Sequence, residues 1–312
     1  MPLDPDIAII IDEIRTRSNV FDPDLSIETR RGAYDSMNRE VMGFDPIEGV
    51  DSEDIEIPSA AGPIPARVYR PQAAAGEPLP TIVYLHGGSW ILGTLDSYDQ
   101  VTRRIARQVP AVVVSVDYRL APEHPFPAGY NDSKVALDWA IDNAATLGGD
   151  VYKVVLSGDS AGGNFTAALS IDARDRGRTF AAQFMFYPSS DLSKRYPSMD
   201  EFGTGYLLET PEVEFADPEY LVDPALRFDP RVSPILSESF AGLPPAIIIT
   251  AEFDPIKDHG DVLAEAYRAA GVTVITRESP GMIHGYLHAG SSPAALAEID
   301  WACAALSELL AR

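Results

Sequence analysis

Residues 154–169 read VVLSGDSAGGNFTAAL. The first four, mostly apolar, predict a short buried strand, and the residues from Gly163 onward have the composition of a helix. Ser160 stands between the two, with Gly158 and Gly162 two positions away on either side. This arrangement predicts a nucleophile elbow, a turn so tight that only very small residues fit beside it and the serine hydroxyl projects from the sheet.

Around this stretch, from about residue 51, strand-like and helix-like segments alternate, which predicts a mostly parallel sheet with helices on both faces. Segments 54–58 and 64–69 alternate apolar and polar residues and flank Gly62-Pro63, so they predict an antiparallel hairpin at one edge. The other strand segments are nearly continuous apolar runs, as expected of buried parallel strands. They are residues 81–85, 111–116, 154–157, 182–186, 246–250 and 272–276. The prediction is an α/β fold with an eight-stranded sheet.

Helical periodicity fills the intervals between strands, at residues 97–108, 132–145, 164–174, 261–270 and 293–311. Two stretches lie outside this alternation. Residues 1–50 predict two short amphipathic helices, and residues 190–233 form a long connection rich in proline and aromatic residues, which is usually functional or a lid. We expect both to form a helical cap over the C-terminal strand ends of a catalytic domain at residues 51–312. The alternative is that residues 1–50 only pack against the edge of the core.

Composition narrows the class of protein. The 312 residues carry a formal net charge of −23, which argues against binding of nucleic acid or of an anionic membrane surface, since both require a basic face. No apolar run approaches the ~20 residues that cross a bilayer. The first residues carry acids where a signal peptide needs positive charge, and the single cysteine, Cys303, cannot form an internal disulfide. We expect a cytoplasmic protein.

Ser160 needs a base and an acid, because a hydroxyl is a poor nucleophile and an imidazole base must be held in one tautomer. On this kind of sheet the order along the chain is serine, acid, histidine. His284 fits because it follows the last predicted strand and the turn-rich residues 279–281. Asp254 has the same place after the preceding strand, from which its carboxylate would accept the Nδ1–H of the imidazole.

Other candidates fit less well. The remaining histidines are His86, His124, His259 and His288. The first two precede the serine, the third would share one loop with the acid, and the fourth lies on the next helix. Among the acids, Glu252 is closer to the strand and is expected to brace the loop. Asp258 lies near a helix start, where an acid offsets the helix dipole whatever the chemistry.

A pocket of N–H donors for the oxyanion is predicted after the strand at 81–85, which ends in HGGSW at residues 86–90. Glycines let backbone amides face a developing oxyanion with no side chain in the way. The amides of Gly87 and Gly88, together with that of Ala161 directly after the nucleophile, are predicted to form this oxyanion hole.

These motifs resemble the hormone-sensitive-lipase-like, or bacterial family IV, carboxylesterases. The stretches that carry the resemblance are HGGSW at 86–90, GDSAGGN at 158–164, DPIKD at 254–258, HGY at 284–286 and the signature YRLAPEHPFPA at 118–128. The resemblance runs from about residue 50 to the end, and the N-terminal helices suit the family's cap. It implies an α/β-hydrolase fold, no cofactor and hydrolysis of short- to medium-chain acyl esters. Relatives often pair through the last strand, which implies a homodimer.

One position departs from the family, whose oxyanion run is usually His-Gly-Gly-Gly, since Ser89 replaces the last glycine. If that position requires a positive φ, serine strains it slightly, so we expect a lower reaction rate without loss of activity.

We therefore predict a serine carboxylesterase acting on a small-molecule ester, with no metal site. The alternatives are an amidase or lactonase with the same triad, or a ligand-binding protein on a catalytically inactive hydrolase scaffold. If His284 is the base, activity should rise with pH around the reference imidazole pKa of ~6.5.

Overall fold

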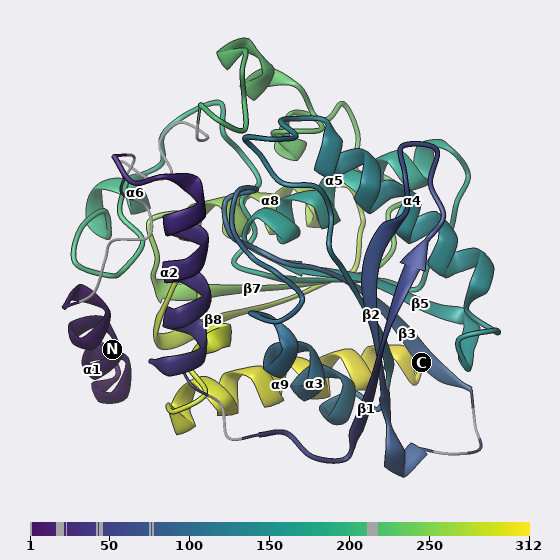
Figure 1. Ribbon diagram of the computed structural model, residues 1–312. Helices are drawn as coiled ribbons and strands as arrows, with labels where there is room; N and C mark the ends of the chain where they lie inside the picture. Colours follow the sequence, from purple (N-terminus) through teal and green to yellow (C-terminus); the bar gives the residue numbers. More distant parts are fainter. Residues whose placement is uncertain are drawn as a thin grey trace.

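A single eight-stranded sheet forms the centre of the chain, with strands in the order β1-β2-β4-β3-β5-β6-β7-β8 (Figure 1). The computed structural model describes residues 2–16, 22, 24–41, 43, 46–74, 76, 78–210 and 218–312. The strands are β1 (Val50–Ile57), β2 (Ile64–Pro71), β3 (Leu79–Leu85), β4 (Val112–Val116), β5 (Gly149–Asp159), β6 (Ala182–Phe186), β7 (Ala246–Phe253) and β8 (Val274–Ile283). Each of the eight predicted strands is present, so the predicted fold class is confirmed.

The predicted hairpin is formed by β1 and β2, which pair along their whole length from Val50 with Pro71 to Ile57 with Ile64. Gly62, with a φ of +114°, lies in the turn between them. Because β2 is also antiparallel to β4, it runs opposite to the other described strands and lies one position in from the edge, and β1 is the edge strand. The remaining strand pairs are parallel.

The last strand differs from its prediction. β8 starts at Val274 and continues to Ile283, through residues 279–281 that were expected to form a turn. Its register against β7 shifts near its end, where Ala251 pairs with Ser279 and Phe253 with Ile283. The extra residues of β8 form a bulge, in which Gly281 has a φ of +74° and donates its N–H to Glu252 at 2.7 Å. This contact agrees with the bracing role expected for Glu252.

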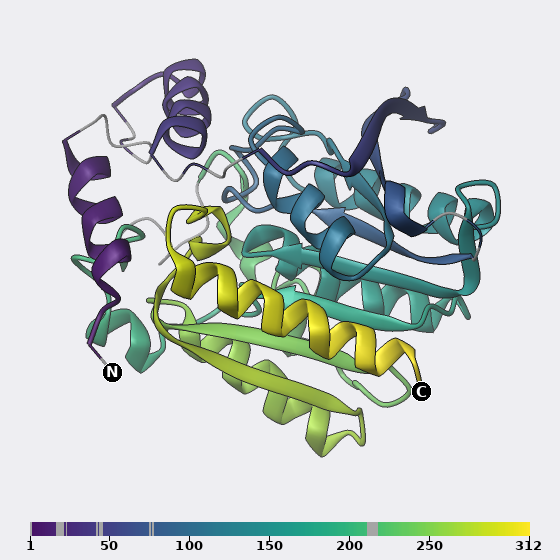
Figure 2. The same ribbon diagram turned by 90° about the horizontal axis from the view of Figure 1, so that it is seen from below.

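Helices cover both faces of the sheet. They are α3 (Asp99–Gln108), α4 (Ala128–Asn143), α5 (Ala161–Asp175), α8 (Lys257–Ala269) and α9 (Pro293–Leu310). Helices α3 and α9 pack together on one face, and α4, α5 and α8 lie on the other (Figures 1 and 2). In the described part of the chain, no helix combines the length and apolar character that crossing a membrane requires.

Two further helices precede the sheet, α1 (Pro5–Arg15) and α2 (Ile27–Glu40). Helix α1 contacts the end of β8, where the amide of Asp4 donates to the carbonyl of Gly281 at 3.1 Å. The long connection at 190–233 contains the short helix α6 (Pro197–Glu201) and a 3₁₀ turn at Pro224–Phe228, while its residues 211–217 lie outside the described part. The assignment of these segments as a cap stays a prediction.

Candidate active site

Ser160 occupies the turn between β5 and α5 that the glycine pattern predicts. Its φ of +51° and ψ of −114° are uncommon for a residue with a side chain. The turn is crowded by β3: a Cβ on Gly158 would lie 2.6 Å from the carbonyl oxygen of Leu85, and one on Gly162 would overlap the same oxygen. Glycine at both positions is therefore a steric requirement of this turn.

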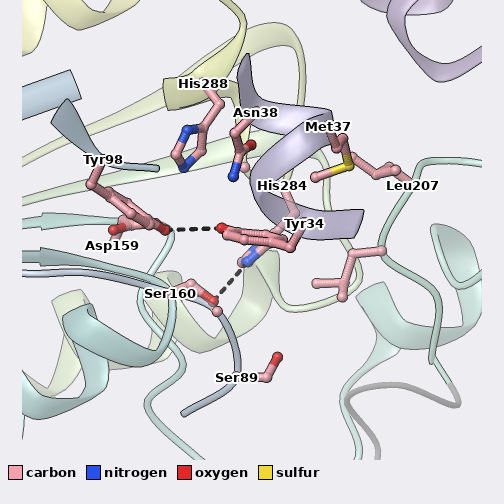
Figure 3. A pocket seen from close by; sticks show the side chains of 13 residues that line it. Tyr34, Met37, Asn38, Ser89, Tyr98, Asp159, Ser160, Leu207, His284 and His288 are labelled. Atoms are coloured by element: carbon pink, nitrogen blue, oxygen red, sulfur yellow. Dashed lines mark hydrogen bonds between the residues drawn. The ribbon is translucent and has the colours of Figure 1, made fainter. Parts of the chain in front are cut away.

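A continuous hydrogen-bonded chain joins Ser160 to the two residues predicted as its partners. The Oγ of Ser160 lies 2.8 Å from Nε2 of His284, and Nδ1 of His284 lies 2.8 Å from Oδ2 of Asp254 (Figure 3 shows the first contact). Asp254 follows β7 directly and is fully buried, and its other oxygen accepts the amide of Ile256 at 2.8 Å. Asp254 is thus fixed from both sides, and the imidazole is oriented with Nε2 toward the serine.

In the described part of the chain, no other histidine forms a hydrogen bond with Ser160. His86 and His259 are buried, which lowers the pKa of each to about 4, and His124 is exposed. Nδ1 of His86 donates to the carbonyl of Gly87 at 2.7 Å. His288 lines the same pocket as the serine, but His284 is the ring that bonds to it. Of the competing acids, Asp258 accepts the amide of Ser198 in α6 at 3.0 Å.

The loop after β3 differs from the predicted oxyanion hole in one residue. The N–H of Gly87 points into the protein, where it lies 2.9 Å from Oδ1 of Asp159 and 3.1 Å from the hydroxyl of Tyr98. It is therefore not available to an oxyanion, and this part of the prediction is wrong. Among the described residues, the amides of Gly88, Ser89 and Ala161 have no hydrogen-bond acceptor. Gly88 and Ser89 line the pocket with Ser160 and have φ values of +107° and +53°.

Asp159 is a site residue that the sequence reasoning missed. It lies inside the elbow next to the serine, fully buried, and its carboxylate accepts the hydroxyls of Tyr84 at 2.8 Å and Tyr98 at 3.1 Å besides the Gly87 amide. Burial raises the pKa of Asp159 to about 6, and these three hydrogen bonds oppose the rise. The sequence did contain a signal, since Asp159 closes an apolar strand that is expected to be buried. A buried carboxylate needs hydrogen-bond donors around it, so this position predicts a polar cluster beside the serine.

The family signature at 118–128 contacts the loop that follows β3. The hydroxyl of Tyr118 donates to the carbonyl of His86 at 2.6 Å, and the two rings stack with centroids 4.3 Å apart. Glu123 forms a two-pronged ion pair with Arg31 of α2, with both N–O distances at 2.8 Å. The stretch has no chemistry of its own, but it holds the oxyanion loop and helix α2 in place.

A pocket opens beside Ser160 and His284 and holds about 530 Å³ of empty space, including its open mouth. Its walls are mainly apolar. They are formed by α2, by the segment around Leu207 and Leu208, and by the loops after β3 and β8; Figure 3 shows the side chains that line it. In the described ranges, no group of three or more His, Cys, Asp or Glu side chains is placed to hold a metal ion.

Comparison with known proteins places this site in a family. A family profile described as alpha/beta hydrolase fold matches residues 82–288. The carboxylic ester hydrolase LipN of Mycobacterium tuberculosis is 43% identical over 249 residues, which are 77% of this chain and 65% of LipN, so slightly less than two thirds of that relative is spanned. An arylesterase of Saccharolobus solfataricus is 32% identical over 92% of this chain and 93% of its own.

Solved structures agree with this assignment. An esterase from the archaeon Pyrobaculum calidifontis superposes with a TM-score of 0.90 at 36% identity, over 100% of both chains. The match covers the sheet, the elbow and the segments that lie outside the family profile. The resemblance predicted from the motifs is therefore confirmed, and the chain belongs to the α/β-hydrolase fold family, in its hormone-sensitive-lipase-like branch of carboxylic ester hydrolases.

Proposed function

We propose that this protein hydrolyses small carboxylic esters through an acyl-enzyme on Ser160. His284 takes the proton of the serine hydroxyl as Oγ attacks the ester carbonyl, and then gives it to the departing alcohol. A water molecule, deprotonated by the same imidazole, attacks the acyl-enzyme carbonyl and releases the acid and the free serine. Asp254 keeps the imidazole in the tautomer with its proton on Nδ1 and stabilises the imidazolium that forms.

The oxyanion in this proposal is held by the amides of Gly88, Ser89 and Ala161. All three have an N–H without an acceptor among the described residues and lie beside the nucleophile in the loop or the helix start. Removing one such donor typically lowers kcat by ~10²–10³-fold. Gly87 acts indirectly, because its bond to Asp159 fixes the direction of the loop.

The observation that carries the proposal is the unbroken chain of two 2.8 Å contacts from Ser160 through His284 to Asp254, at the wall of an apolar pocket. An isolated Ser-X-Gly turn or an isolated His–Asp pair occurs for structural reasons. The complete chain places a nucleophile, a base and an orienting acid at the spacing that acyl transfer needs.

The pocket favours small acyl groups. The cavity itself, without its open mouth, measures about 60 Å³, well below the roughly 300–1,000 Å³ of sites for drug-sized ligands. We expect turnover of 4-nitrophenyl esters to be highest at a few acyl carbons and to fall steeply for long chains. Efficient hydrolysis of emulsified long-chain triglyceride would contradict this substrate class.

A labelling experiment tests the nucleophile. The wild-type protein should form a stoichiometric adduct with a fluorophosphonate, identified by mass spectrometry on the peptide with Ser160, and Ser160→Ala should lose both the adduct and the burst of released nitrophenol. Ser307→Ala, which removes a half-buried serine of α9, serves as the matched control and should keep both. An adduct elsewhere, or a burst that survives in Ser160→Ala, would rule out Ser160.

Two further features belong to the proposal. A homodimer through β8 is supported by the position of this strand at an edge of the sheet, and sedimentation at several protein concentrations tests it, with a monomer at all of them as the contradicting result. The cytoplasmic location stays a prediction from the sequence, to be tested by cell fractionation.

A further inference from the structure

Two buried polar side chains lie together in the pocket and take no part in the proposed reaction. Asn38 of α2 is 7% exposed, and His288, in the 3₁₀ turn that follows His284, is 4% exposed. Both line the pocket (Figure 3), and we call them the polar end of the pocket. Neither the amide oxygen nor the amide nitrogen of Asn38, nor Nε2 of His288, has a hydrogen-bond partner in the described part of the chain.

The nearest polar groups on the protein are the hydroxyls of Tyr34 and Tyr98, and Asn38 interacts with the Tyr34 hydroxyl without the geometry of a full hydrogen bond. The hydroxyl of Tyr34 bonds to the hydroxyl of Tyr98 at 3.2 Å, and that of Tyr98 donates to Asp159. The ring of Tyr98 packs edge-on against His288, with centroids 4.5 Å apart. An unpartnered buried polar group destabilises a protein, and natural proteins retain few of them. Three such atoms among the side chains that line one substrate pocket therefore point to an occupant that pairs with them.

The chemistry of the polar end defines this occupant. Burial lowers the pKa of His288 to about 3, so its ring is neutral at working pH. A neutral imidazole and an amide each offer a donor and an acceptor but no charge to balance an ion. The carboxylate of Asp159, which also lines the pocket, disfavours an anion. A hydroxyl group, which both donates and accepts, matches the pair.

We propose that the polar end of the pocket binds a hydroxyl group of the substrate, so that the enzyme prefers hydroxy-substituted esters to alkyl esters of the same shape. This inference rests on the proposed esterase function and adds its substrate class. The hydroxyl can belong to the acyl chain or to the alcohol, since the reacting carbonyl at Ser160 carries both, and the experiment has one arm for each.

The test compares esters in which a hydroxyl replaces a methyl group. The acyl arm uses 4-nitrophenyl 3-hydroxybutanoate against 4-nitrophenyl 3-methylbutanoate, and the alcohol arm uses 2-hydroxypropyl acetate against isobutyl acetate, followed by acid release. In one arm the wild-type kcat/KM should favour the hydroxy ester by roughly 3- to 30-fold, the range for one or two buried neutral hydrogen bonds. The arm that shows the preference identifies the half of the ester that enters the pocket.

Two variants assign the preference to the polar end. Asn38→Leu keeps the shape of the side chain, and His288→Phe keeps a ring against Tyr98; each should move the ratio toward one. Each should also raise kcat/KM for the alkyl ester, because that substrate no longer covers an unpaired polar atom, and a merely structural residue would not give this gain. Ser36→Ala, on the same helix but outside the pocket lining, should leave both values unchanged.

The outcomes separate this inference from the proposed function. If the wild-type enzyme hydrolyses both members of each pair at rates within twofold, or if both variants keep its ratio, the inference is overturned and the esterase function stands. The ratio of kcat/KM between hydroxy ester and alkyl ester is measured on the wild-type enzyme alone. The test therefore still works if Asn38→Leu misfolds. Failure to hydrolyse any of these esters, without a fluorophosphonate adduct on Ser160, would overturn the proposed function itself.

Discussion

Asp159 and Ser160 are adjacent in the chain and both line the pocket, but their side chains have different partners. The serine bonds to His284, whereas the aspartate accepts hydrogen bonds from Gly87 of the oxyanion loop, Tyr84 and Tyr98. The same turn thus presents the nucleophile and fixes the loop whose amides receive the negative charge. This coupling explains why an acid is retained where it must be buried.

The raised pKa of Asp159 predicts the shape of the pH profile. With a pKa of about 6, this carboxyl gains a proton as the pH falls through 6 and then accepts fewer hydrogen bonds from the loop and Tyr98. Below pH 6 we therefore expect kcat/KM to fall as Asp159 gains its proton, as measured with a soluble nitrophenyl ester.

Asp159→Asn isolates this effect. An amide offers one acceptor oxygen and cannot accept the Tyr98 hydroxyl at its nitrogen, so we expect kcat/KM at pH 8 to fall roughly 10- to 100-fold through misplacement of the loop. The acid limb of the variant should be less steep than that of the wild type, since an amide at position 159 does not titrate. A variant limb as steep as that of the wild type would show that Asp159 does not titrate in this range.

Ser89 carries a testable strain. Its φ of +53° lies in the left-handed region, where a side chain costs about 1–2 kcal/mol relative to the right-handed one. Ser89→Gly keeps the amide and removes the strain, so we expect the free energy of unfolding in urea to rise by about 1 kcal/mol with no loss of kcat. Ser237→Gly is the control: its φ of −65° is ordinary, so glycine there should give no gain.

At the scale of elements, the sequence predicted where the strands and the three reactive residues lie along the chain, but it did not predict local backbone orientation. The parallel strands were predictable because each is a nearly uniform apolar run, and the serine, acid and histidine because each follows such a run. The bulge in β8 was not, since Pro280-Gly281 indicates a turn unless pairing with β7 is known. The orientation of the Gly87 amide depends on Asp159, a partner from a strand much later in the chain.

Arg31 links helix α2 to the loops that follow β3 and β4. Its guanidinium donates to the carbonyls of Ile91 and Ala121, both at 2.9 Å, and pairs with Glu123. Because α2 contributes pocket wall but none of the three reactive residues, Arg31→Ala should raise KM about 3- to 10-fold and change kcat less. Steady-state kinetics on 4-nitrophenyl butanoate measures both.

Arg39→Ala provides the comparison for this prediction, because Arg39 is exposed on the same helix. It should leave KM within the error of the measurement. If Arg31→Ala lowers kcat at constant KM, then α2 affects the reacting groups and not the binding of the ester.

At the scale of the whole molecule, charge is the dominant feature. The 47 acidic residues outnumber the 24 lysines and arginines, and this excess repels itself more strongly in the compact state than in the unfolded one. Salt at about 0.5 M shortens the screening length to a few ångström. We expect Tm to rise by about 2–4 °C on going from low salt to 0.5 M NaCl, which corresponds to about 1 kcal/mol.

The same measurement near pH 4.4, the isoelectric point, is its control, since the net charge vanishes there and the salt effect should vanish with it. A Tm that falls with added salt at neutral pH would mean that attractive ion pairs, such as Arg277 with Glu298, outweigh the repulsion.

The nucleophile, the acid and the base follow β5, β7 and β8, and the sheet alone sets the spacing of these three strand ends. The long connection at 190–233 leaves β6 and returns to β7 without supplying any of them. Exchanging this connection for that of a homologue is thus a route to new selectivity by recombination. We expect such a chimaera to keep its rate constant for an activated acyl donor and to accept a different range of esters.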